Sequence, residues 1–237
     1  MLGALAILAA ANVLNNRVAP RYAPLTSAAA TGALIALARR SGLTWRDLGF
    51  EHGRRGALLG AAVVLGGVVP LYAAGVAWPR TRPFFLDERS LGLSRPRLAE
   101  EVLLQIPVGT VLLEEVGFRG VVYGLAARSH GPAAATALSS AAFGLWHVLP
   151  AVALARSNPG ISALASSDHE SFTPEGLEPR PRQIALSIAG SVAATAAAGV
   201  LFCALRRRGG LLAPAMLHTA TNTLGHLAAR AARRLGR

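Results

Sequence analysis

The sequence contains no lysine, a single cysteine and few aromatic or acidic residues. All 24 basic residues are therefore arginine, which against 12 acidic residues gives a formal net charge of +12. Only 15% of the residues are charged, whereas 52% are hydrophobic, and the mean hydropathy is +0.42. This composition is too apolar for an ordinary soluble domain and indicates a protein that crosses a membrane several times.

These shortages exclude several classes of protein. Cys203 alone cannot form an intramolecular disulfide or a cysteine zinc cluster. The arginines stand mostly at the ends of apolar runs, as at Arg39-Arg40 and 206–208, where they can contact lipid head groups. We therefore predict membrane lipids as partners and no binding of nucleic acid.

Seven apolar runs organise the chain. A spanning helix needs roughly 20 mostly apolar residues. The runs cover residues 2–14, 23–38, 56–78, 98–127, 132–155, 184–205 and 211–229. The polar stretch 156–183 contains four prolines and is expected to be an extramembrane loop. The runs predict an all-α, polytopic bundle of about six to seven transmembrane helices in the cell membrane.

Three of these runs carry polar side chains that are unfavourable in lipid. An ionisable residue within a spanning helix is by default a functional-site hypothesis. The polar residues of these three runs are Glu114, Glu115, Arg119, His147, His218 and Asn222. Because they come from three helices, the most favourable arrangement turns them towards one water-accessible cavity.

Helical spacing indicates which of these side chains share a face. Residues four apart lie on one face of a helix, so Glu115 can form an ion pair with Arg119. Phe143 and His147, and likewise His218 and Asn222, have the same spacing. Glu114 projects about 100° away from Glu115 and is free to face elsewhere.

The predicted cavity combines a carboxylate, a second imidazole and an imidazole–amide pair. These groups can act as a general base, a partner that shares the proton, and two donors to an oxyanion. The set favours hydrolysis of an amide by activated water. Each motif alone has a simpler explanation, namely a structural ion pair, a packed histidine or hydrogen bonds between helices. Their joint occurrence on three helices favours a functional site.

The ordered motifs resemble those of a known family. "EEVGFR" (residues 114–119), "FGLWH" (143–147) and "HTATN" (218–222) are similar to the EExxxR, FxxxH and HxxxN motifs of the CPBP family. This family, also called ABI, contains CAAX proteases and bacteriocin-processing intramembrane endopeptidases. The resemblance covers about residues 98–229 and implies a glutamate-dependent membrane endopeptidase with a conical, water-accessible cavity.

The resemblance also implies a role for each matching residue. Glu114 would activate the water with His147 as its partner, and His218 with Asn222 would form the oxyanion hole. Glu115, Arg119 and Phe143 would support the geometry of the site. The substrate would be a peptide or a lipid-modified protein. Independently of the resemblance, the lysine-free, Ala- and Arg-rich composition of the chain is typical of a GC-rich bacterial genome.

The expected domain organisation follows from the extent of the resemblance. Residues 1–97 are expected to form N-terminal transmembrane helices and interfacial segments, residues 98–229 a catalytic membrane domain, and residues 230–237 a basic tail. No basic segment precedes the first run, 2–14, which favours an uncleaved signal-anchor over a cleaved signal peptide.

Three alternatives remain open at this stage. Two histidines and a glutamate could ligate zinc, although the HExxH pair of metalloproteases is absent and activation of water by a glutamate needs no metal. We therefore predict no metal and no cofactor. A non-catalytic binding or bacteriocin self-immunity protein would retain the same residues. A transporter or proton relay is disfavoured, because the chain has no paired halves.

Overall fold

The computed structural model describes residues 1–157 and 181–236. This part of the chain contains helices and no strands, so the predicted all-α class is confirmed. The α-helical elements include α1 (Leu2–Val13), α2 (Ala23–Arg40), α3 (Gly53–Val63), α4 (Val69–Ala77), α6 (Arg95–Glu100), α7 (Leu112–Glu114), α8 (Tyr123–Trp146), α9 (Val148–Ser157), α11 (Pro181–Gly209) and α12 (Leu212–Leu235).

Shorter or wider helical segments connect several of these helices. The π-helical segments are η1 (Leu14–Val18), η3 (Val64–Val68), η5 (Glu101–Val111) and η6 (Glu115–Val122). Two 3-10 turns and one short α-helix complete the set: η2 (Pro20–Tyr22), η4 (Arg82–Phe85) and α5 (Glu88–Leu91). Most of the expected extramembrane loop, 156–183, lies outside the described residues.

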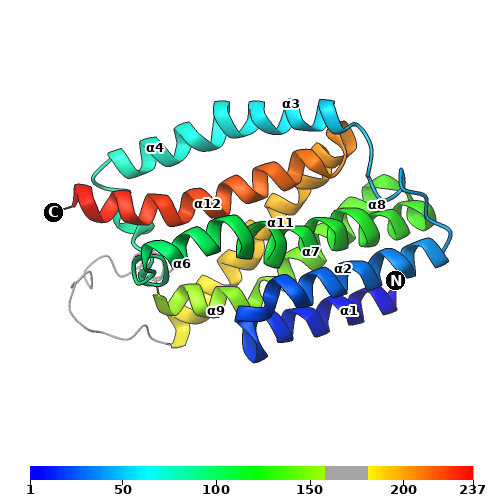
Figure 1. Ribbon diagram of the computed structural model, residues 1–237, viewed down its shortest axis with the longest axis horizontal. Coiled ribbons are helices and arrows are strands. Elements are labelled where there is room, and N and C mark those ends of the chain that lie inside the picture. The colour runs from blue at the N-terminus through cyan, green and yellow to red at the C-terminus, as the bar shows by residue number, and fades with distance from the viewer. Residues whose placement is uncertain (158–180, 237) are drawn as a thin grey trace.

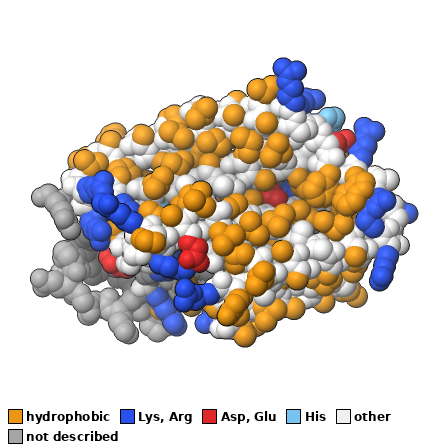
Figure 2. Space-filling model, viewed as in Figure 1, with side chains coloured by type: hydrophobic (Ala, Val, Ile, Leu, Met, Phe, Trp, Pro, Cys, Tyr) orange, Lys and Arg blue, Asp and Glu red, His pale blue; other side chains and the backbone are white. Residues whose placement is uncertain are grey.

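The helices form one elongated bundle (Figure 1). The α3–α4 helix lies along α12, α2 lies beside α1, and α11 runs across the bundle against α8. Hydrophobic side chains cover the middle of the face shown in Figure 2, and the arginines gather mostly at its two ends. This distribution is expected where the middle of a protein lies in lipid and its ends contact head groups.

Fewer helices are long and apolar enough to cross a membrane than the apolar runs of the sequence predict. By length and composition alone, two helices in the described part of the chain could cross a membrane, Gly53–Ala77 and Ile184–Gly209. The helical stretch Arg95–Trp146, which is itself interrupted at Gly131, and the helix Val148–Arg156 are bent by 41° at their junction and could form a third span. The predicted count of six to seven is not confirmed.

Local sequence explains where the long helices change direction. Gly131 adopts φ +80°, a value that favours glycine, and Pro132 follows it, so the helix that begins at α6 ends there and a second helix starts within α8. Gly210, at φ +64°, ends α11 in the same way. Pro107 lies inside η5, where a wider turn accommodates its missing N–H group.

One expectation about the fifth run is wrong. His147 does not lie within a continuous helix, because α8 ends at Trp146 and α9 begins at Val148. The backbone N–H of His147 bonds to the carbonyl of Gly144, three residues back, and this tight last turn ends the helix. The break places the imidazole at a helix end and not on a helix face.

The helices α8 and α11 approach closely at a glycine, which gives a test of the packing. A Cβ atom at Gly144 would lie 2.8 Å from the carbonyl oxygen of Val192 and 2.9 Å from the Cβ of Ala196. We expect Gly144→Ala to push the helices apart and to lower the free energy of unfolding by about 1–3 kcal/mol. Thermal unfolding in detergent measures this change.

The control is Gly190→Ala on α11, where the added Cβ meets nothing within 4 Å in the described part of the chain. This variant should unfold at the wild-type temperature or slightly above it, since alanine favours helix. Equal unfolding temperatures for the two variants would contradict the packing of α8 on α11.

Candidate active site

Glu114 lies at the centre of a cluster of polar side chains. Its side chain is buried in the middle of the helix that carries both glutamates, where only 4% of the residue is exposed. The indole Nε1–H of Trp146 donates a hydrogen bond to its Oε1 atom at 2.8 Å. Its Oε2 atom lies 3.9 Å from Nε2 of His147 and 3.8 Å from Nε2 of His218. One carboxylate oxygen is thus held, and the other faces two imidazoles.

Glu115 projects in a different direction from Glu114, about 100° around the helix, as its adjacent position predicts. Its Oε1 atom lies 2.8 Å from Nδ1 of His218 and 3.4 Å from a terminal nitrogen of Arg119. The Arg119 contact is an ion pair without an aligned hydrogen bond, since its guanidinium nitrogens have no such partner among the described residues. The predicted pairing of these two residues is therefore present, and His218 joins it.

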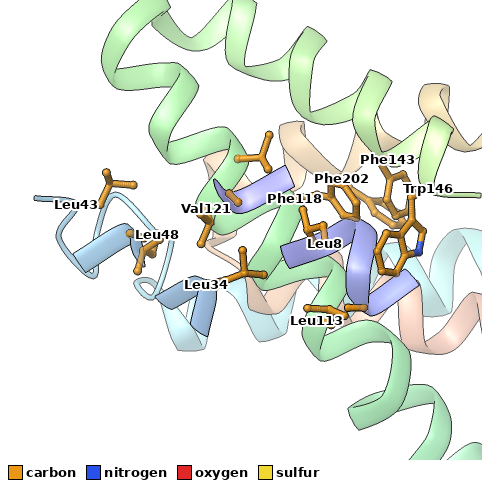
Figure 3. Close-up of a cluster of buried hydrophobic side chains, with 14 of the residues drawn as sticks. Leu8, Leu34, Leu43, Leu48, Leu113, Phe118, Val121, Phe143, Trp146 and Phe202 are labelled. Atoms are coloured by element: carbon orange, nitrogen blue, oxygen red, sulfur yellow. The ribbon is translucent and has the colours of Figure 1, made fainter. Parts of the chain in front are cut away.

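Arg119 is fully buried, with 0% of the residue exposed. Its guanidinium carbon lies 3.7 Å from the centre of the Phe143 ring and 4.6 Å from the centre of the Phe202 ring. The faces of aromatic rings attract cations, and more strongly where water is excluded. Figure 3 shows the two phenylalanines side by side within the hydrophobic cluster. This aromatic contact and Glu115 together compensate the buried charge.

The hydrogen bonds define which nitrogen of each imidazole carries a proton. Nδ1 of His147 lies 2.8 Å from the carbonyl oxygen of Phe143, and a carbonyl only accepts, so we assign the proton to Nδ1. The same reasoning assigns a proton to Nδ1 of His218, which faces the carboxylate of Glu115. In their neutral forms both imidazoles therefore direct the lone pair of Nε2 towards Glu114.

These side chains share one cavity of about 550 Å³. Four residues predicted from the sequence line it, namely Glu114, His147, His218 and Asn222. Its other lining residues are mainly polar and include Asn15, Asn16, Arg21, Arg89, Arg97, Glu101, Gln105 and Thr110. The structure thus brings the predicted catalytic set together, whereas Glu115, Arg119 and Phe143 lie behind it and do not line it.

A second, apolar cleft of about 870 Å³ is lined by Glu115 and does not include Glu114. It lies between α3, η5 and α12, and its only polar lining side chains in the described part of the chain are Glu115, Thr219 and Thr223. Figure 2 shows an acidic side chain at the bottom of a depression in the hydrophobic face. The two adjacent glutamates thus separate a polar cavity from an apolar cleft.

Sequence reasoning missed two contributors to the site, Trp146 and Phe202. The position of Trp146 directly before His147 was a usable signal, because a buried indole N–H requires an acceptor. Phe202 gave no signal, since it stands in an ordinary apolar run of α11 and is brought to Arg119 only by the packing. In the described residues no group of three His, Cys, Asp or Glu side chains is arranged to hold a metal ion.

The fold and the site define a helical membrane protein with a buried cluster of carboxylate and imidazole side chains. The comparisons with known proteins agree with this class. Residues 101–224 match the family model described as type II CAAX prenyl endopeptidase Rce1-like, which covers more than half of the chain, and the protein belongs to this family. The resemblance to CPBP proteases is thereby confirmed. Neither the curated proteins nor the solved structures compared with the chain gave a match.

The buried ion pair gives a test of the residues that lie behind the cavity. We expect Arg119→Ala to leave Glu115 without its cation and to lower the free energy of unfolding by about 3–5 kcal/mol. Chemical unfolding in detergent, followed by circular dichroism, measures the loss. The control is Arg46→Ala, which breaks an exposed pair with Glu51 and should have little effect. A fully stable but inactive Arg119→Ala protein would contradict the structural role of Arg119.

Proposed function

We propose that the protein is an intramembrane endopeptidase in which Glu114 activates a water molecule to hydrolyse a peptide bond. Membership of the family implies a CAAX-type endopeptidase, and the site geometry supports this mechanism. The observation that carries the proposal is the convergence of Glu114 Oε2 and two imidazole Nε2 atoms within 3.9 Å. These separations are too long for direct hydrogen bonds and suit a bridging water.

The proposed reaction begins with proton transfer from this water to Glu114, with His147 sharing the proton through Nε2. The resulting hydroxide attacks the carbonyl carbon of the scissile peptide bond. The C–N bond then breaks, and the proton passes to the leaving nitrogen to give an amine and a carboxylic acid, which afterwards transfers its own proton to the amine or to water. Aligning the water and the carbonyl in one cavity supplies part of the rate enhancement.

His218 and Asn222 are proposed to stabilise the oxyanion that forms on the carbonyl oxygen. A neutral His218 cannot donate from Nε2, because its proton lies on Nδ1 against Glu115. We therefore propose that His218 acts as an imidazolium, whose charge Glu115 stabilises. With Glu114 and Arg119, the buried charges then sum to zero, whereas a neutral His218 would leave one uncompensated negative charge in the protein interior.

The apolar cleft supports a lipid-modified substrate. The family description names prenyl substrates, and an isoprenoid chain would find a hydrophobic surface that ends beside the second glutamate.

We also propose six or seven membrane crossings, as the apolar runs of the sequence predict. Leucines 25, 71 and 103 are about 70% exposed or more and would contact lipid. A membrane-embedded bundle would let the chain of the substrate enter from the bilayer.

The role of Glu114 is tested by peptide cleavage with detergent-purified protein. Glu114→Gln keeps the size of the side chain but removes the base, so we expect no detectable turnover from a folded variant. Asn222→Ala should lower kcat by about 10²–10³-fold, the usual effect of removing an oxyanion donor. Products are read by mass spectrometry from a mixed peptide library.

The matched control is Glu88→Gln, which changes an exposed glutamate and should cleave at the wild-type rate. A chelator should have no effect on the wild-type protein, and loss of activity on chelation would favour the zinc alternative. Absence of cleavage by folded wild-type protein would contradict the protease and favour the non-catalytic binding protein.

The lipid part of the proposal is tested by filling the cleft. Ala215→Phe adds an aromatic ring to its lining, so KM should rise for a prenylated peptide and stay unchanged for the same peptide without the lipid. Ala185→Phe, on an exposed face of α11, is the control and should change neither value. An equal effect of Ala215→Phe on both peptides would contradict binding of the lipid in this cleft.

A further inference from the structure

We propose that Trp146 is a positioning residue for the hydrolysis, which holds the Glu114 carboxylate so that one defined oxygen faces the water. This proposal rests on the proposed function, because it assigns a role within that reaction. The motifs that identify the family residues do not include Trp146. The contacts of the indole N–H group suggest its role.

The indole fixes one carboxylate oxygen and leaves the other available. Trp146 is buried, and its Nε1–H group donates to Oε1 of Glu114 at 2.8 Å. The Oε2 atom of Glu114 is buried and has no hydrogen-bond partner in the described part of the chain. A carboxylate held at one oxygen cannot rotate freely, so the lone pairs of Oε2 keep their direction towards His147 and His218.

Packing holds the indole itself. Its ring contacts the Phe118 ring edge to face, with 5.5 Å between the centres. Figure 3 shows the Trp146 ring beside the phenylalanines, with its nitrogen on the side away from them. Buried indole N–H groups require an acceptor, and Glu114 supplies one. The orientation of the ring and that of the carboxylate are therefore linked.

The end of α8 is held by a helix outside the family match. Because α8 stops at Trp146, its last carbonyl groups lack intrahelical donors. Nδ2 of Asn12 in α1 donates to the carbonyl oxygen of Trp146 at 2.9 Å, and Nδ2 of Asn16 donates to Oδ1 of Asn12 at 2.7 Å. The match begins at residue 101, so α1 contributes to the site from outside it.

Kinetics give the first test. Trp146→Phe keeps an aromatic ring and removes the N–H donor, so kcat should fall by about 10- to 100-fold, the usual effect of losing a hydrogen bond to a charged group. KM should stay within about twofold, because substrate binding does not use this bond. The control is Trp78→Phe, the same change at an exposed position, which should leave both constants unchanged. An unchanged kcat in Trp146→Phe would overturn the proposal.

A spectroscopic test is independent of activity. The double variant Trp45→Phe/Trp78→Phe retains Trp146 as its only tryptophan, because the chain contains three. The ¹H chemical shift of its ¹⁵N-labelled indole N–H is then compared with and without Glu114→Gln. Since an amide oxygen is a weaker acceptor than a carboxylate, we expect a clear upfield shift in the Gln variant. Identical signals would overturn the hydrogen bond itself.

The two tests separate the failure of this proposal from the failure of the proposed function. If the protein cleaves no peptide but its indole signal shifts in the Glu114→Gln variant, the hydrogen bond exists and the proposed hydrolysis is wrong. The positioning role of Trp146 would then be wrong as well. If Trp146→Phe does not fold, a benzothienyl analogue of tryptophan is incorporated in the single-tryptophan protein. This analogue keeps the ring shape and has sulfur in place of N–H, so the same fall in kcat is expected, and full activity would overturn the proposal.

Discussion

The buried ion pair between Glu115 and Arg119 is the interaction on which the rest of the site depends. An unpaired charge in the interior of such an apolar chain would be strongly unfavourable. The 3.4 Å contact with Glu115 and the rings of Phe143 and Phe202 compensate the guanidinium. Glu115 in turn holds His218 at 2.8 Å, and His218 directs its other nitrogen towards Glu114. One compensated charge thus orients the groups assigned to catalysis.

Interruptions of regular helix then bring the other groups into place. The break after Trp146 moves His147 out of the regular helix, and its imidazole bonds to the Phe143 carbonyl that a continuing helix would have used. The π-helical segment Glu115–Val122 follows directly after Glu114. Such segments are frequent at functional sites, because they place side chains where a regular helix would not. The site therefore depends on backbone geometry as much as on residue identity.

The two adjacent glutamates separate environments of opposite character. Glu114 faces a polar cavity that suits water and a peptide, whereas Glu115 forms the end of an apolar cleft that suits a hydrocarbon chain. A substrate that carries both a peptide and a lipid would need both environments close together. Neighbouring positions on one helix provide this, because they project about 100° apart. Under the proposed function, this arrangement would give the two adjacent acidic residues different roles.

The sequence by itself determined the helical class, the apolar runs and the identities of the polar residues. It also predicted the Glu115–Arg119 pair, since residues four apart in a helix are neighbours through local geometry alone. Only the tertiary structure decided the break at His147, the stacking of Phe202 on Arg119 and the bond from Trp146 to Glu114. The contacts of Phe202 and Trp146 join positions far apart in the sequence. The same is true of His218 and Glu115, which are separated by 103 residues. Local periodicity contains no information about such distances, because the packing of whole helices sets them.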